Sequence, residues 1–97
     1  WCDDIRSNYY NKYIKINNSR SLNINYESLW RQDNAYDLII ETSHNTKPTI
    51  KNKGSAIFIH CSFKNLRTTS GCVALQKKDL LFLIRNINSE ASIEIKK

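Results

Sequence analysis

Two residues that can carry out nucleophilic chemistry together, His60 and Cys72, lie twelve positions apart in this 97-residue chain. A cysteine is mostly thiol near neutral pH, so it acts as a nucleophile only when a neighbour takes its proton or stabilises the thiolate. A histidine can do both. Gly71, directly before the cysteine, permits backbone angles or a close approach that a Cβ would block, and backbone N–H groups at such a turn can meet a developing oxyanion. The pair predicts a thiolate nucleophile with a histidine base.

The chain also contains residues of the same types for which a structural role is the simpler interpretation. A lone cysteine is more often a small buried hydrophobe than a catalyst, and this alternative stays open for Cys72. Cys61 follows His60 along an expected strand and must point to the opposite face, so we expect it in the core. His44 stands between Ser43 and Asn45 in an expected loop, where solvation is the default.

The segments around these residues favour a mainly β fold with one amphipathic helix. Residues 36–41 form a short apolar run that predicts a strand near the core, and residues 43–53 have the composition of an exposed, mobile connection. Residues 55–60 are almost continuously apolar, as a strand buried on both faces would be, and they end at His60. Such a strand would hold the imidazole on a rigid element.

The end of the chain predicts the helix and a closing strand. Residues 77–87 carry apolar side chains at spacings of three and four, which places Leu80, Leu83, Ile84 and Ile87 on one face, widened by Leu81 and Phe82. The start of this helix is expected close enough to Cys72 to favour its thiolate. Residues 91–96 alternate polar and apolar, which predicts a half-buried strand. Residues 1–31 show no sustained helical spacing and no sustained alternation, which predicts loops with short elements.

Composition bounds the class of protein. A chain of 97 residues with 40% hydrophobic and 25% charged residues is expected to fold as a single small domain. It has no run of about 18 apolar residues, so no transmembrane segment is expected within it. It contains no methionine and no charged start followed by an apolar stretch, so we interpret it as a fragment, a processed product or a trimmed piece, and expect any targeting segment to lie outside it.

The net charge of +6 suits an acidic partner, either nucleic acid or an anionic envelope polymer. The basic residues are dispersed rather than clustered, which favours plain surface solvation. The three cysteines match no zinc spacing, so no metal site is expected, and they make a disulfide framework unlikely although a pair between Cys2 and Cys61 stays open.

Several segments occur in the order and spacing of the L,D-transpeptidase catalytic domain, and the chain resembles that family. They are Tyr36-Asp-Leu-Ile-Ile40, His44-Asn45, Gly54-Ser-Ala-Ile-Phe-Ile-His60 and Thr69-Ser-Gly-Cys-Val-Ala-Leu75. Trp1-Cys-Asp-Asp4 and Tyr10-Asn11 narrow the resemblance to a compact bacterial branch. The histidine-bearing strand followed by the Thr-x-Gly-Cys element is the specific part of this pattern.

The resemblance implies acyl transfer on peptidoglycan stem peptides, the expected partner, in the periplasm or cell envelope. Cys72 would attack the carbonyl of the third residue of a donor tetrapeptide, release D-alanine and pass the acyl group to an acceptor amine, giving a 3→3 cross-link. His60 would be the base, and no cofactor or metal is needed. Gly71, Ser70 and Thr69 would support the oxyanion hole and the turn. Asn45, Arg67 and His44 are the substrate-binding candidates, with turn chemistry or solvation as their alternatives.

The chain departs from many members of the family in two ways. Ser70 and Ala74 replace a histidine and an arginine or asparagine, which changes how substrate would be held. Family domains also carry strands before the Trp-Cys-Asp-Asp segment, so the resemblance implies that residues 1–97 are one partial domain, the C-terminal portion of a β-sandwich. An unpaired strand edge would then invite self-association. The alternatives are an impaired remnant that binds cell wall or protein and, from charge and aromatics alone, a nucleic-acid-binding module, which the resemblance disfavours.

Overall fold

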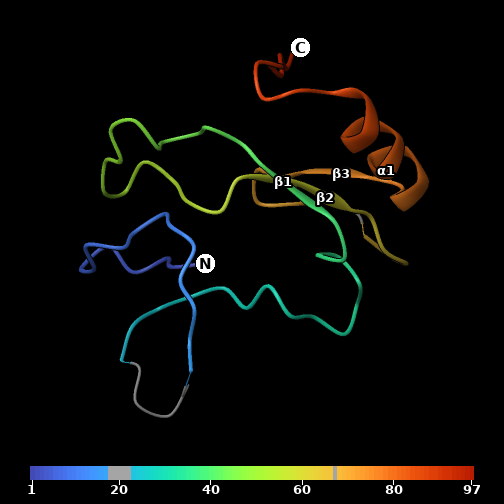
Figure 1. Ribbon diagram of the computed structural model, residues 1–97. Coiled ribbons are helices and arrows are strands. Elements are labelled where there is room, and N and C mark those ends of the chain that lie inside the picture. The colour runs from blue at the N-terminus through green and yellow to red at the C-terminus, as the bar shows by residue number, and fades with distance from the viewer. Residues whose placement is uncertain (18–22, 67) are drawn as a thin grey trace.

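The computed structural model describes residues 1–17, 23–66 and 68–97, with three strands and one helix in this part of the chain. Their order is β1 (Ile39–Glu41), β2 (Phe58–Cys61), β3 (Val73–Leu75) and α1 (Lys77–Asn86), as Figure 1 shows. The remaining described residues are turns and extended connections. The expected fold class, mainly β with one helix, is confirmed.

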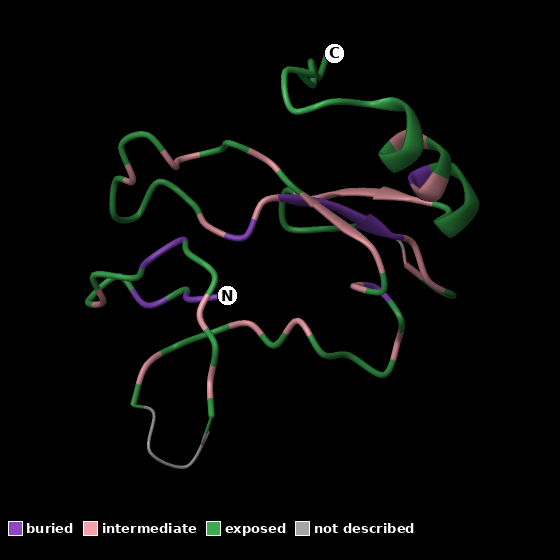
Figure 2. Ribbon diagram, in the orientation of Figure 1, coloured by how far each residue is buried: buried purple, intermediate pink, exposed green. Residues whose placement is uncertain are grey.

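Strand β2 is the centre of the three-stranded sheet. It pairs antiparallel with β1 and parallel with β3, so that His60 stands opposite Ile39 on one side and Ala74 on the other. All four residues of β2 are buried, as the continuous apolar run predicted for a strand covered on both faces. Figure 2 shows this strand as the buried centre of the sheet.

Successive residues of β2 pack against different layers because side chains alternate across a strand. Ile59 and Cys61 form one cluster with Leu80 of α1. Phe58 belongs to a second cluster with Trp1 and Ala56. The sheet therefore has a helix on one face and turns of the N-terminal half on the other. The expectation that Cys61 is a core residue is confirmed.

Helix α1 keeps only the first part of its expected apolar face, because Ile84 and Ile87 are exposed and Ile87 lies just after the helix. Leu80 is fully buried and Leu83 packs beside it on the same face. Phe82 is 69% exposed, so the expectation that it widens this face is wrong. Two residues turn a helix by about 200°, which places Phe82 on the side opposite Leu80. The helix ends after Asn86, whose side-chain Nδ2 donates to the Phe82 carbonyl.

The two expected strands before the helix are shorter in the structure. Residues 36–38 lie in turns because the Asp37 amide bonds the Asn34 carbonyl, and Asn34 has a positive φ. Residues 55–57 stay outside the sheet because the Ala56 amide donates to the side chain of Asn11 instead of to a strand. Hydrogen-bond partners, which periodicity does not reveal, decide these boundaries.

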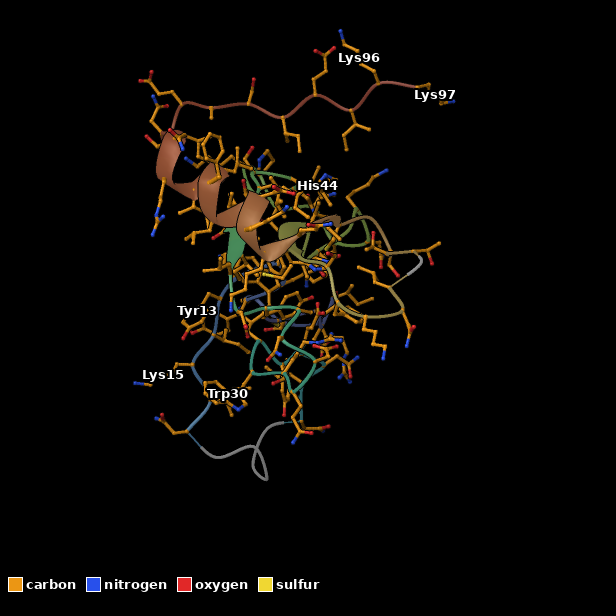
Figure 3. The ribbon with its side chains drawn as sticks, turned by 90° about the vertical axis from the view of Figure 1, so that its right-hand side faces the viewer. Tyr13, Lys15, Trp30, His44, Lys96 and Lys97 are labelled. Atoms are coloured by element: carbon orange, nitrogen blue, oxygen red, sulfur yellow. The ribbon has the colours of Figure 1, made fainter. Side chains whose placement is uncertain are left out.

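The expected closing strand at residues 91–96 is wrong. These residues have no strand partner in the described part of the chain and are exposed, with Ile95 at 77%. In Figure 3 the segment ending at Lys96 and Lys97 runs beyond α1, at the end of the molecule opposite Trp30 and Lys15. Alternation is a local pattern, whereas a strand needs a neighbour to pair with.

Residues 1–17 and 23–31 fold by turns, as expected, with an isolated bridge between Cys2 and Tyr26, and residues 18–22 lie outside the described part of the chain. The buried Asn11 links distant parts of the molecule: its amide oxygen accepts from the Trp1 indole and the Ala56 amide, and its amide nitrogen donates to the carbonyls of His44 and Asn45. None of the described helices is long and apolar enough to cross a membrane.

Candidate active site

A cavity of about 620 Å³ lies on the face of the sheet opposite α1, and both His60 and Cys72 line it. Polar and charged side chains from other parts of the chain, mostly from its N-terminal half, complete the wall. Among them are Asp3, Glu27, Arg31, Tyr36 and Ser55. The structure therefore places the predicted nucleophile and the predicted base at one solvent-accessible site.

Cys72 directly precedes β3 and is half-buried. The parallel register that sets Val73 opposite Ile59 brings Cys72 beside Phe58. Its thiol donates to the Ala56 carbonyl at 3.2 Å and accepts from the Phe58 amide at 3.4 Å. These two contacts orient Sγ.

The turn before Cys72 is closed by Thr69. The Thr69 hydroxyl donates to the Cys72 carbonyl at 2.6 Å and accepts from the Gly71 amide at 3.4 Å. Thr69, Ser70 and Gly71 are all exposed. The structure thus gives the Thr69 hydroxyl the backbone partners that the sequence suggested.

Gly71 has a φ of +129°, a conformation that side chains rarely adopt. A Cβ at this position would lie 3.0 Å from Cδ1 of Ile57. The turn therefore requires glycine for its backbone conformation and for its close approach to the Ile57 side chain.

His60 is 5% exposed, and its Nδ1 lies 2.9 Å from the Cys61 carbonyl oxygen. A carbonyl oxygen only accepts hydrogen bonds, so Nδ1 carries a proton. In the neutral ring the lone pair is then on Nε2. The main-chain contact selects the tautomer whose free nitrogen can act as a base.

The expectation that the start of the helix assists the thiolate is wrong. Strand β3 separates Cys72 from Lys77, where α1 begins, and a strand extends about 3.3 Å per residue. The helix also packs on the Ile59 and Cys61 face, whereas Cys72 lines the cavity on the other. The influence of a helix terminus is confined to its first turn, so α1 is badly placed to act on Sγ.

The structure keeps His44 and Asn45 in the loop between β1 and β2, outside the wall of the cavity. His44 Nε2 lies 3.0 Å from the Lys53 carbonyl oxygen. The Asn45 side chain donates to the carbonyls of Ile50 and Gly54, and its oxygen accepts from the Ile50 amide. Both side chains order this loop. Arg67 lies outside the described residues, and its proposed contact with substrate stays a prediction.

Sequence reasoning missed Tyr36 as a site residue. Its ring packs edge to face with the His60 ring, with centroids 5.6 Å apart, and its hydroxyl donates to Glu27. Burial first, and then the hydrogen bond to Glu27, raise the pKa of Tyr36 well above its ordinary value. Tyr36 and His60 are 24 positions apart in the sequence, which explains why no local pattern revealed this contact.

The three cysteines are all free thiols, so the disulfide left open between Cys2 and Cys61 is absent from the structure. Within residues 1–17, 23–66 and 68–97, no group of three or more His, Cys, Asp or Glu side chains is arranged to hold a metal.

Comparison with known proteins gives one match. Residues 4–95 match the family model of YkuD, the L,D-transpeptidase catalytic domain. Searches of curated proteins and of solved structures found no match. The family model covers nearly the whole chain, including the strand that bears His60 and the turn that bears Cys72. The chain therefore belongs to the L,D-transpeptidase catalytic domain family.

Proposed function

We propose that this domain is an L,D-transpeptidase that forms 3→3 cross-links between peptidoglycan stem peptides through a Cys72 acyl-enzyme. The observation that carries the proposal is the shared cavity of His60 and Cys72, together with the contact between His60 Nδ1 and the Cys61 carbonyl. That contact leaves Nε2 as the base. Family membership supports the type of reaction and the substrate class.

In the first half-reaction His60 Nε2 takes the proton of the Cys72 thiol, and Sγ attacks the carbonyl carbon of the third residue of a donor tetrapeptide. The resulting oxyanion is stabilised by backbone amides of the turn formed by Thr69, Ser70, Gly71 and Cys72. Collapse of the tetrahedral intermediate breaks the bond to D-alanine. The imidazolium returns the proton to the departing amine, and a thioester on Cys72 remains.

In the second half-reaction the side-chain amine of an acceptor stem peptide attacks the thioester carbonyl. His60 takes a proton from this amine as the new amide bond forms, and then returns it to the Cys72 thiolate as the C–S bond breaks. The reaction consumes one donor and one acceptor and releases D-alanine. We place it in the periplasm or cell envelope, where such stem peptides are found.

The Thr69 hydroxyl fits a role in holding the turn, because it is bonded to the backbone on both sides of the Cys72 position. We assign His44 and Asn45 a structural role in the loop between β1 and β2, because their side chains already bond to the main chain at Lys53 and Gly54. Arg67 remains the candidate for a bidentate contact with a stem-peptide carboxylate.

The test is the intact mass of the chain after exposure to a tetrapeptide-stem donor. We expect an adduct equal to the donor minus D-alanine on the parent chain and on Cys61→Ala. We expect none on Cys72→Ala or His60→Ala. Cys61→Ala is the matched control because it removes a thiol from the opposite face of the sheet. A folded parent chain that gains no adduct would instead favour an impaired remnant that binds the cell wall or a protein.

A further inference from the structure

Tyr36 occupies a position on the cavity wall that the proposed reaction leaves without a role. Its ring makes an edge-to-face contact with the imidazole of His60, at an interplanar angle of 85°. It makes a second such contact with Phe58, with centroids 5.9 Å apart. Phe58 and His60 lie on the same face of β2, so the tyrosine ring packs against both of the β2 side chains on the cavity face.

Two further groups, Glu27 and Arg31, hold the tyrosine itself. Its hydroxyl donates to the Glu27 carboxylate, and the Arg31 guanidinium lies 5.2 Å from the ring centroid. Arg31 is in turn paired with Asp33 and lies 3.9 Å from Glu27. A half-buried ring held at its hydroxyl, at its edge and over its face has little freedom to rotate.

The hydroxyl of Tyr36 is unsuited to proton transfer. Burial, the hydrogen bond to Glu27 and the negative charges of Glu27 and of an ionised Cys72 all raise the pKa of Tyr36, so the phenol stays neutral where the enzyme would act. It therefore does not compete with His60 as a base. What its contacts supply is a fixed orientation for the imidazole.

We propose that Tyr36, held by Glu27, is a positioning residue for His60 in the acyl transfer. The Cys61 carbonyl fixes one edge of the imidazole through Nδ1, but a single hydrogen bond allows the ring to pivot. The Tyr36 ring restricts that pivot and keeps Nε2 directed into the cavity. This inference rests on the proposed function, because it concerns the base of that reaction.

Two substitutions of Tyr36 separate the contribution of its ring from that of its hydroxyl. Tyr36→Leu removes the aromatic contact, and we expect kcat to fall by about 10-fold to 100-fold with KM for the donor unchanged, since misplacing a catalytic group has effects of this size. Tyr36→Phe keeps the ring and loses the bond to Glu27, and we expect a loss of roughly 3-fold to 10-fold, the rate equivalent of one hydrogen bond. Glu27→Leu should match Tyr36→Phe, and the double variant should be no slower than either.

A second measurement does not need the substrate. Iodoacetamide reacts with the thiolate, and Cys2 and Cys61 are buried, so its reaction rate as a function of pH reports on Cys72 and its base. We expect Tyr36→Leu to move the midpoint of this profile to higher pH and Tyr36→Phe to move it less. The control is Tyr9→Leu, the same substitution at an exposed tyrosine away from the cavity, which should change neither measurement.

The outcomes distinguish this inference from the proposed function. An unchanged kcat and alkylation profile in folded Tyr36→Leu would overturn the positioning role, even if the parent chain forms the acyl-enzyme. A parent chain that never acylates would overturn the proposed function, while a displaced alkylation profile in Tyr36→Leu would still support the contact with His60. If Tyr36→Leu does not fold, Tyr36→Phe decides: rates and profile equal to those of the parent would overturn the inference.

Discussion

The two faces of the sheet are built by different interactions although they share the same short strand. On one face, Ile59 and Cys61 pack against Leu80 of α1 in an apolar cluster. On the other, Phe58 packs in a smaller apolar cluster with Trp1, and beside it His60 lines an open cavity whose wall is held by side-chain hydrogen bonds such as that from Tyr36 to Glu27. Neighbouring residues of β2 thus face a closed core and a site open to ligand.

This difference shows how a small domain can combine stability with a reactive site. Apolar burial stabilises the helix face without directional requirements, whereas hydrogen bonds and ring contacts on the cavity face fix particular atoms. The Cys61 carbonyl joins the two faces, because a residue whose thiol is in the core supplies the acceptor for His60 Nδ1. Substitutions of the same kind on the two faces should therefore have different effects.

The largest expected effect separates the two cysteines. Cys72→Ala should lower the rate of acyl transfer by at least about 1,000-fold, because it removes the nucleophile. Cys61→Ala should keep most of the rate and lower the free energy of unfolding by about 1 kcal/mol, because a small buried group is lost. Transfer assays and urea unfolding of both variants check this. Equal rates for the two variants would contradict the assignment of the faces.

On the helix face, Leu80→Ala should lower the free energy of unfolding by about 2–5 kcal/mol, since Leu80 is fully buried and its truncation leaves a cavity. Phe82→Ala is the matched control on the same helix and should stay within about 0.5 kcal/mol of the parent, because Phe82 is exposed. Urea unfolding followed by circular dichroism measures both. A larger effect at Phe82 than at Leu80 would show that the packing of α1 is different.

At the turn on the cavity face, Gly71→Ala should lower stability by about 1–3 kcal/mol, because its φ of +129° is strained for alanine and the added Cβ crowds Ile57. It should also slow acylation, since the turn carries Cys72. Gly54→Ala, at a φ of +97°, is the matched control and should lower stability with a smaller loss of rate. Acylation by the donor, measured beside thermal unfolding, separates the two effects.

Acid should first weaken the N-terminal half of the chain, where Asp4 and Asp33 are held by arginines. The hydrogen bonds from Arg6 hold the pKa of the buried Asp4 well below its ordinary range, and those from Arg31 lower the pKa of Asp33 from 3.8 to about 2. Both carboxylates stabilise the fold above their ordinary pKa. This stabilisation is lost as pH falls from about 4 towards 2 for Asp33, and at still lower pH for Asp4. In Asp33→Asn the decline in urea stability between pH 5 and pH 2 should be shallower. An identical decline in the parent and this variant would contradict the assignment.

Much of the fold could be predicted because its signals are local. The apolar run that ends at His60 indicated the central strand, and the spacing of Leu80 and Leu83 indicated α1. The alternation along residues 91–96 misled for the same reason, because a period says nothing about whether a partner strand exists. Residues 36–38 and 55–57 were expected in strands but lie outside them, because Asn34 and Asn11 offer their backbone other hydrogen-bond partners.

The sequence by itself determined which residues could react: a cysteine after a glycine in a turn, and a histidine on a buried strand. It also determined the family, since the order and spacing of these segments are properties of the chain alone. Only the tertiary structure decided that Tyr36 and Glu27 complete the wall around His60 and that α1 lies on the other face from Cys72. The physical reason is that such contacts join residues far apart in sequence, and their geometry exists only after the chain has folded.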